Sequence, residues 1–215
     1  MSPLQALAAW YDTVHGLVDG GLFSASSAFG RDIAALGDLN GDGVVDIAVS
    51  APMDDDGGTS RGAVHMLFLK SDGSVAGQQK ISSTRSNLGA SALGSGDQFG
   101  SGLATLGDLN GDGKTDVLAA SLGDMIIVWF DRIEGTENDW DLVVVSDGVQ
   151  GPYDTVPLDF DFDGDTDVVC ASTNDNRIAW FENLYGDGQF WELHVITKDA
   201  SAVHDIFIAD VDQDG

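Results

Sequence analysis

The sequence predicts an all-β fold, a partial β-propeller of four-stranded blades, and three observations support this prediction. Of the 36 acidic residues 32 are Asp, and together with 28 Gly they suit turns and oxygen-ligand loops better than helices. Short runs rich in Val, Ile and aromatic residues recur at roughly ten-residue spacing. A nine-residue acidic loop returns at offsets of 70 and then 51 residues, which is the size of a propeller blade.

The predicted strands are short runs bounded by Gly, Asp, Asn or Ser: residues 44–49, 63–69, 117–120, 125–130, 142–145, 168–171, 178–181 and 206–209. Because no linker or composition break divides the chain, we expect one partial propeller over residues 1–215. Its expected parts are the tail of a preceding blade (1–23), three blades (24–93, 94–147 and 148–199) and the start of a further blade (200–215).

The charge of the chain restricts its partners. The 215 residues carry a formal net charge of -27, and 43% of them are apolar, which is too many for a disordered acidic tail. The acidic excess argues against nucleic acid and anionic membrane surfaces. No apolar run approaches the roughly 18 residues of a membrane span, Met1–Leu17 does not resemble a signal peptide, and the single Cys170 cannot form an internal disulfide. Bound cations would relieve the self-repulsion of such a chain.

The repeated acidic loop has the pattern of a cation cage. Positions 1, 3, 5 and 9 carry carboxylate or amide side chains, position 6 is Gly, and position 7 can offer its backbone carbonyl. The expected ligands of the three complete loops are Asp38, Asn40, Asp42, Val44 and Asp46; Asp108, Asn110, Asp112, Lys114 and Asp116; and Asp159, Asp161, Asp163, Asp165 and Asp167. An incomplete fourth loop offers Asp210, Asp212 and Asp214.

Calcium is the expected cation, because every ligand is oxygen and no Cys or His stands at ligand spacing. The loops are not EF-hands, since position 12 is Val49, Ala119 or Cys170 where an EF-hand has Glu, and their flanks are predicted strands. A simple hairpin turn explains the Asn-Gly and Asp-Gly pairs. It does not explain the further carboxylate at position 9 or the stacking of like charges.

Two other stretches, one rich in Gly and one acidic, are interpreted as loops and not as catalytic or metal-binding sites. Gly58–Gly62 matches the G-x-S-x-G motif of hydrolases. That motif needs a preceding strand and a following helix, whereas here a Gly- and Asp-rich loop precedes a predicted strand. We interpret it as a hairpin loop. Asp54-Asp55-Asp56 is interpreted as a solvated loop, with an additional cation site as the alternative.

Aromatic residues and histidines are assigned to packing. We expect one ring of each pair, Trp129-Phe130 and Trp180-Phe181, to pack between adjacent blades; a carbohydrate-binding face is the alternative. The histidines show no metal-ligand spacing and are interpreted as solvated or at the edge of the core: His15, His65, His194 and His204. No carboxylate pair stands out as a catalytic acid and base.

Three segments of the chain resemble the repeat of a known family. Phe29-Gly30, the acidic loop from Asp38, and Ala48–Pro52 resemble the FG-GAP repeat of integrin α-subunit propellers. The second copy keeps Phe99-Gly100 but departs from the GAP element at Ala120–Leu122. The resemblance implies a propeller of usually seven blades, with a Ca²⁺ loop in the hairpin between the first two strands of each blade.

The later part of the chain is similar to a related repeat. From Trp129 onward, and especially at Asp175–Asn183, it resembles the VCBS-type repeats of bacterial and algal surface proteins. The two resemblances imply a non-enzymatic, extracellular or cell-surface adhesion module whose Ca²⁺ ions rigidify the blade loops and whose partner is a protein or carbohydrate. The alternative is an accessory propeller of a secreted hydrolase or lyase with its active site elsewhere.

The number of repeats is smaller than in a closed ring of seven. We therefore expect about three blades plus two partial ones, an open stack whose uncovered faces favour self-association. A ring of four blades, in which the strand around Trp10 and the strand around Ile206 share one blade, is the alternative.

Overall fold

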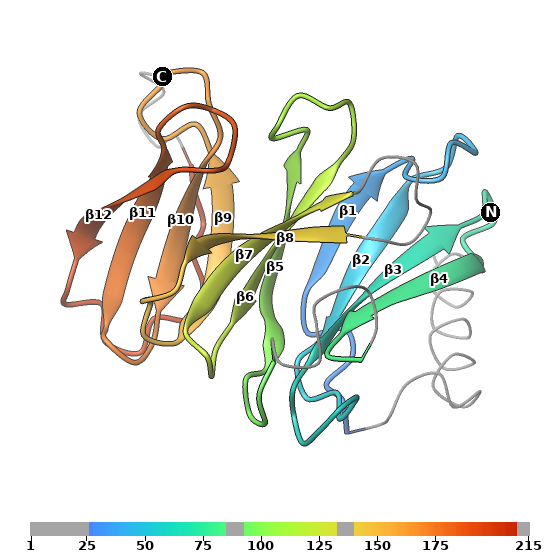
Figure 1. Cartoon of the computed structure of the whole chain (residues 1–215), viewed down its shortest axis with the longest axis horizontal. Helices are drawn as coiled ribbons and strands as arrows, with labels where there is room; N and C mark the ends of the chain where they lie inside the picture. The colour runs from blue at the N-terminus through green and yellow to red at the C-terminus, as the bar shows by residue number, and fades with distance from the viewer. Residues whose placement is uncertain (1–25, 85–92, 133–139, 210–215) are drawn as a thin grey trace.

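The computed structural model describes residues 26–84, 93–132 and 140–209, and these residues form strands and connecting loops without a helix. Figure 1 shows three antiparallel sheets side by side. The first holds β1 (Ile33–Gly37), β2 (Asp46–Ala51), β3 (Ala63–Leu69) and β4 (Val75–Ser82). The second holds β5 (Phe99–Gly107), β6 (Asp116–Ser121), β7 (Ile126–Arg132) and β8 (Trp140–Ser146). The third holds β9 (Pro152–Leu158), β10 (Asp167–Ser172), β11 (Arg177–Asn183) and β12 (Trp191–Thr197).

Each sheet is a meander in which sequence neighbours pair, so every sheet runs in the order first, second, third and fourth strand. The first strands of the three sheets lie next to one another, because β5 packs against both β1 and β9. Four-stranded meanders that meet along their first strands are propeller blades. The predicted all-β fold of four-stranded blades is therefore confirmed, whereas the residues at which one blade ends and the next begins remain a prediction.

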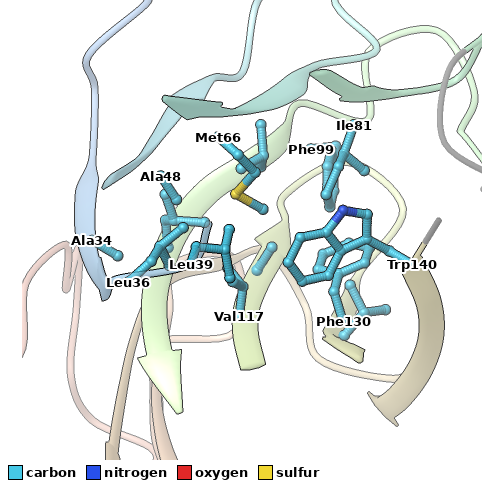
Figure 2. Packing of buried hydrophobic residues seen from close by; sticks show 14 of the residues in the cluster. Ala34, Leu36, Leu39, Ala48, Met66, Ile81, Phe99, Val117, Phe130 and Trp140 are labelled. Carbon is cyan, nitrogen blue, oxygen red and sulfur yellow. The ribbon is translucent and has the colours of Figure 1, made fainter. Parts of the chain in front are cut away.

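The middle sheet is buried on both faces. Trp129 and Phe130 are neighbours on β7 and so point to opposite sides of the sheet. Phe130 joins the cluster between the first and second sheets, where it meets Phe99 edge to face at 5.5 Å and lies near Trp140 (Figure 2). Trp129 joins the cluster between the second and third sheets with Phe181. Both rings of the pair thus pack between blades, one more than predicted.

Polar contacts near the first strands connect successive sheets. The Leu103 N–H donates to the Asp32 carboxylate at 2.8 Å, and so joins β5 to the chain just before β1. The Ser101 hydroxyl donates to the Pro152 carbonyl at 3.1 Å, which joins β5 to β9. The Ile206 N–H donates to the Asp154 carboxylate at 2.8 Å. The segment after β12 is therefore attached to the third sheet by the same kind of hydrogen bond, from a backbone N–H to an Asp carboxylate, as the one that joins the first sheet to the second.

Seven of the predicted strands correspond to strands in the structure, with ends shifted by a few residues, and the eighth prediction is wrong. Residues 206–209 form no strand, because the Ile206 N–H bonds to a side chain and no described strand pairs with this segment. Phe207 is 91% exposed.

Five strands were not predicted: β1, β4, β5, β9 and β12. Strands β1, β4 and β5 are rich in Gly, Ala or Gln, β9 contains Pro152 and Pro157, and β12 carries Glu192 and His194 between its apolar residues. They form because a neighbouring strand supplies their hydrogen bonds, and Pro is tolerated in β9 because it is an edge strand of its sheet.

Replacing Asp32 should loosen the contact between the first two sheets. We expect Asp32→Ala to lower the free energy of unfolding by about 1.5 to 3 kcal/mol, because it removes a charged acceptor and leaves the Leu103 N–H without its partner. Urea unfolding measures the change. The exposed Asp199→Ala is the control and should change stability by less than about 0.5 kcal/mol. Equal effects of the two substitutions would show that the contact carries no stability.

Candidate metal centres

The three acidic loops occupy equivalent places in the three sheets. They connect β1 to β2, β5 to β6, and β9 to β10, which is the hairpin that the family resemblance implies. Because the strands are antiparallel, all three loops lie at the same end of their sheets, opposite to the connections between the second and third strands. The fourth loop, with Asp210, Asp212 and Asp214, lies outside the described residues.

One set of hydrogen bonds recurs in every loop. The carboxylate at position 1 accepts the N–H of the position-6 glycine at 2.7, 2.9 and 3.1 Å in the three loops. The oxygen at position 3 accepts the N–H of position 5 at 2.9, 3.0 and 3.2 Å. The carboxylate at position 5 accepts the N–H of position 7 at 2.9 Å each time. The loops therefore share one conformation that turns the side-chain oxygens of positions 1, 3 and 5 inward along the backbone.

The third loop keeps this conformation at a cost. Its position 4 is Phe162, where the other loops have Gly41 and Gly111. Phe162 also has a positive φ, 63° against 79° and 76° at the two glycines. Its ring is 75% exposed and so gains little from packing. A non-glycine residue in the left-handed region is strained by about 1 to 2 kcal/mol. Such strain persists where the surrounding structure over-determines it, as at a ligand site.

The position-9 carboxylates are buried. Asp46 and Asp116 are 0% exposed and Asp167 is 1% exposed. One oxygen of each accepts the N–H of loop position 2 at 2.9 to 3.0 Å. The other oxygen accepts the N–H of Leu69 in the first sheet and of Asn183 in the third, both at 2.9 Å. In the first and third sheets position 9 thus anchors the loop to the third strand, a structural role that sequence analysis did not identify.

Asp116 differs from the other two position-9 residues. Its Oδ1 atom is buried without a hydrogen-bond partner. Burial, opposed by the hydrogen bond from the Leu109 N–H and reinforced by the neighbouring carboxylates of Asp131, Asp112 and Asp108, raises its pKa to about 7. A buried carboxylate oxygen without a partner is unfavourable, and a cation is the partner that this cluster of acids would accept.

Oxygens converge most clearly in the third loop. Asp159, Asp161 and Asp167 each offer an oxygen within 4.8 Å of the others, and Asp159 Oδ1 is buried without a hydrogen-bond partner. In the second loop the Lys114 ammonium lies 2.7 Å from Asp112, so position 5 there already has a cationic neighbour. An all-oxygen set on a flexible loop suits Ca²⁺. The residues present therefore fit that ion.

The Asp54-Asp55-Asp56 stretch is solvated at Asp55 but not at Asp54. Asp54 is only 6% exposed. The Lys80 ammonium lies 2.7 Å from the Asp54 carboxylate and 3.3 Å from that of Asp56. The side chain of β4 therefore supplies the cation that these acids need, and the alternative of an additional metal site loses its support.

Other expected features have clear places. Gly58–Gly62 lies in the connection from β2 to β3 and leads into a strand, so it lacks the helix that a nucleophile elbow needs. His65 is 1% exposed, with its ring edge-on to Phe29 at 5.5 Å, so its assignment to solvent or to the core edge is wrong.

Trp180 stacks on Phe160 at 4.7 Å and on His194 at 4.5 Å. Both faces of its ring are covered, which weighs against a carbohydrate platform there.

A polar pocket of about 360 Å³ lies where the first strands meet, lined by Arg31, Asp32, Ser101, Tyr153, Asp154, His204 and Asp205. The Arg31 guanidinium lies 4.2 Å from the centre of the Tyr153 ring, and His204 stacks on that ring at 4.6 Å. Two of its carboxylates, Asp32 and Asp154, already accept backbone N–H groups.

The described residues contain no helix that is long and apolar enough to cross a membrane.

Comparison with known proteins assigns repeats to most of this chain. Residues 29–67 match the FG-GAP repeat, and residues 108–170 and 159–215 match the FG-GAP-like repeat, together more than half of the chain. Integrin alpha-2 of Mus musculus is 32% identical over 126 residues, which are 55% of this chain and 10% of that protein. Integrin alpha-7 of Homo sapiens is 37% identical over 106 residues, 49% of this chain and 8% of that protein. The chain thus spans only about a tenth of the length of these relatives.

Replacing the residue at position 5 of the third loop tests the proposed Ca²⁺ site without removing a buried hydrogen bond. Asp163 is exposed and accepts only the Asp165 N–H. We expect Asp163→Ala to bind one Ca²⁺ fewer per chain by isothermal titration calorimetry. Asp187→Ala is the matched control, because Asp187 accepts the Gln189 N–H in the same kind of turn outside the loops, and it should keep the full number. The same stoichiometry in both variants would contradict the ligand assignment.

The Lys80 cluster should show in the acid dependence of stability. Burial alone would raise the pKa of Asp56, but hydrogen bonds from Thr84 and Ser82 and the Lys80 ammonium outweigh it and lower the pKa from 3.8 to about 2. A lowered folded-state pKa stabilises the fold above the unfolded value of 3.8, and this contribution disappears as the pH falls towards 2. We expect wild type to exceed Asp56→Asn in stability at pH 6, and the difference to shrink between pH 4 and 2. A difference that is constant with pH would rule this out.

Proposed function

Since the chain belongs to the FG-GAP repeat family, we propose that it is a calcium-binding propeller module of an extracellular adhesion or surface protein. The observation that supports this most is the third loop, where three carboxylate oxygens converge within 4.8 Å. The same hydrogen bonds recur in the other two loops. A turn that needed only to reverse the chain would not require buried like charges at position 9.

In this proposal the side chains at positions 1, 3, 5 and 9 and the carbonyl at position 7 hold the ion in each of the three loops. The position-9 carboxylate connects the ion to the sheet, since it also accepts N–H groups from the loop and, in the first and third sheets, from the third strand. When bound, Ca²⁺ neutralises the acids and rigidifies the hairpin. The module does not need to catalyse a reaction.

The opposite ends of the sheets would carry the binding surface. The connections from β2 to β3, β6 to β7 and β10 to β11 lie there, away from the proposed ions. A partner of a chain with net charge -27 should present basic groups, because charge complementarity speeds encounter and selects partners. We infer a protein ligand, by analogy with the integrin relatives, in preference to a carbohydrate, because the Trp180 ring has both faces covered.

Calcium should stabilise the fold strongly. A ligand that binds only the folded state adds about 2.7 kcal/mol per site at a hundredfold excess over its Kd. For a chain of this size that is a rise in Tm of about 5 to 10 °C for each occupied site. Thermal melts in millimolar Ca²⁺ and in EDTA measure the shift, with Mg²⁺ at equal ionic strength as the control. Identical melts in Ca²⁺ and EDTA would refute the calcium part of the proposal. The adhesion part fails separately if beads coated with the calcium-loaded chain do not attach to extracellular matrix.

A further inference from the structure

A second kind of metal-ligand cluster lies on the third sheet, away from the acidic loops. Glu182 on β11 stands directly opposite Glu192 on β12, and His194 follows two residues after Glu192 on the same face. One ligand atom from each of the three lies within 4.8 Å of the other two. His194 Nε2 is 2.7 Å from Glu182 Oε2. None of these residues belongs to a repeated acidic loop.

The cluster is on the outer face of the sheet. Phe181, the neighbour of Glu182 on β11, points into the cluster between the second and third sheets, so Glu182 points the other way. Strand β12 is the edge of the sheet farthest from β9 (Figure 1). Glu192 is exposed, and about a third of the His194 side chain is accessible. An ion from solvent can therefore reach all three groups.

The imidazole is held in place before any ion binds. His194 stacks on Trp180, its cross-strand partner, at 4.5 Å with the rings 20° apart. Trp180 is supported from its other side by Phe160 at 4.7 Å. This stack restricts the ring and keeps Nε2 on the side of the two carboxylates. A ligand that is already oriented loses less conformational entropy on binding.

The two glutamates create a need for positive charge. Like charges directly opposite each other in an antiparallel pair are destabilising. The equivalent positions of the second sheet are Asp131 and Asp141, which also face each other, but there Val143 replaces the histidine. Asp141 is exposed and Asp131 only partly buried, even though the third sheet packs on that face. The equivalent place on the third sheet would remain accessible under a further blade.

We propose that Glu182, Glu192 and His194 form a binding site for a borderline transition-metal cation of the Zn²⁺ class. An imidazole nitrogen with two carboxylates is a donor set for Zn²⁺ and not for Ca²⁺, which takes oxygen ligands. Metal–ligand bonds of about 2.0 to 2.2 Å place two ligand atoms about 3.3 Å apart in a tetrahedral site. The distance of 2.7 Å between His194 Nε2 and Glu182 Oε2 would lengthen towards this value, and the other separations are at most 4.8 Å. The fourth position is left to water or to a donor group of a partner.

The site would join the edge strand β12 to β11 and offer an open coordination position on the surface of the module. It does not depend on the calcium proposal, because it shares no residue with the acidic loops.

The test is a Zn²⁺ titration of the 215-residue chain with the acidic loops saturated by millimolar Ca²⁺. Calorimetry counts the bound Zn²⁺, and quenching of Trp fluorescence by Cu²⁺ gives a local readout because Trp180 stacks on His194. We expect one Zn²⁺ per chain in excess Ca²⁺. His194→Val, which copies the second sheet, should abolish this binding, and Glu192→Gln should weaken it at least about tenfold.

The control is His204→Gln, which alters a stacked histidine outside the cluster and should bind Zn²⁺ like wild type. Glu192 is exposed, so its isosteric variant reports on the ligand even if His194→Val affects folding. Unchanged Zn²⁺ affinity in Glu192→Gln, equal loss in His204→Gln, or displacement of Zn²⁺ by Ca²⁺ would overturn the proposal. Absence of Zn²⁺ binding to wild type would show an ion pair only and would overturn it as well.

Discussion

Each blade depends on one buried carboxylate. At position 9 of each loop, an Asp that is at most 1% exposed accepts the N–H of loop position 2 and so closes the hairpin between the first two strands. In the first and third sheets it also accepts an N–H of the third strand. A buried carboxylate is costly unless hydrogen bonds or a cation compensate it. The same atom group thus serves the fold and the proposed ion. If the loops bind Ca²⁺ as proposed, ion binding and the stability of the blade are coupled, because one side chain takes part in both.

The middle sheet shows how blades depend on each other in turn. Its β7 strand directs Phe130 to one neighbour and Trp129 to the other, and the Trp129 indole N–H donates to the Gly188 carbonyl of the third sheet at 2.9 Å. The equivalent Trp180 of the third sheet has no such neighbour among the described residues and stacks instead on Phe160 and His194. An equivalent repeat position therefore packs against a neighbouring blade in the second sheet and within its own sheet in the third.

Sequence reasoning was strongest where local chemistry determines structure. The turns of the acidic loops could be expected from the sequence, because Asp spacing and the position-6 glycine define a turn without reference to distant residues, whereas the role of these residues as ligands remains a prediction. The strands β1, β5 and β9 were missed because their Gly-, Ala- or Pro-containing segments become strands only when a neighbour supplies hydrogen bonds. The Lys80 contact with Asp54 and the meeting of Glu182, Glu192 and His194 were missed for the same reason. Both depend on the register between strands, which no local pattern specifies.

The repeats also differ in a way that gives each blade its own surface. Asp54, Asp124 and Asp175 hold the same place, the third residue after the second strand of their sheets. Lys80 neutralises the first at 2.7 Å and Arg177 the third at 3.0 Å. Burial, opposed by the Ser121 hydroxyl and reinforced by Asp97, instead raises the pKa of Asp124 to about 6. Since the proposed ion-binding ends of the sheets are nearly identical, we expect recognition that distinguishes one blade from another to come from this opposite end. There the acidic residue keeps its place after the second strand, and its cationic partner is Lys80 in the first sheet and Arg177 in the third.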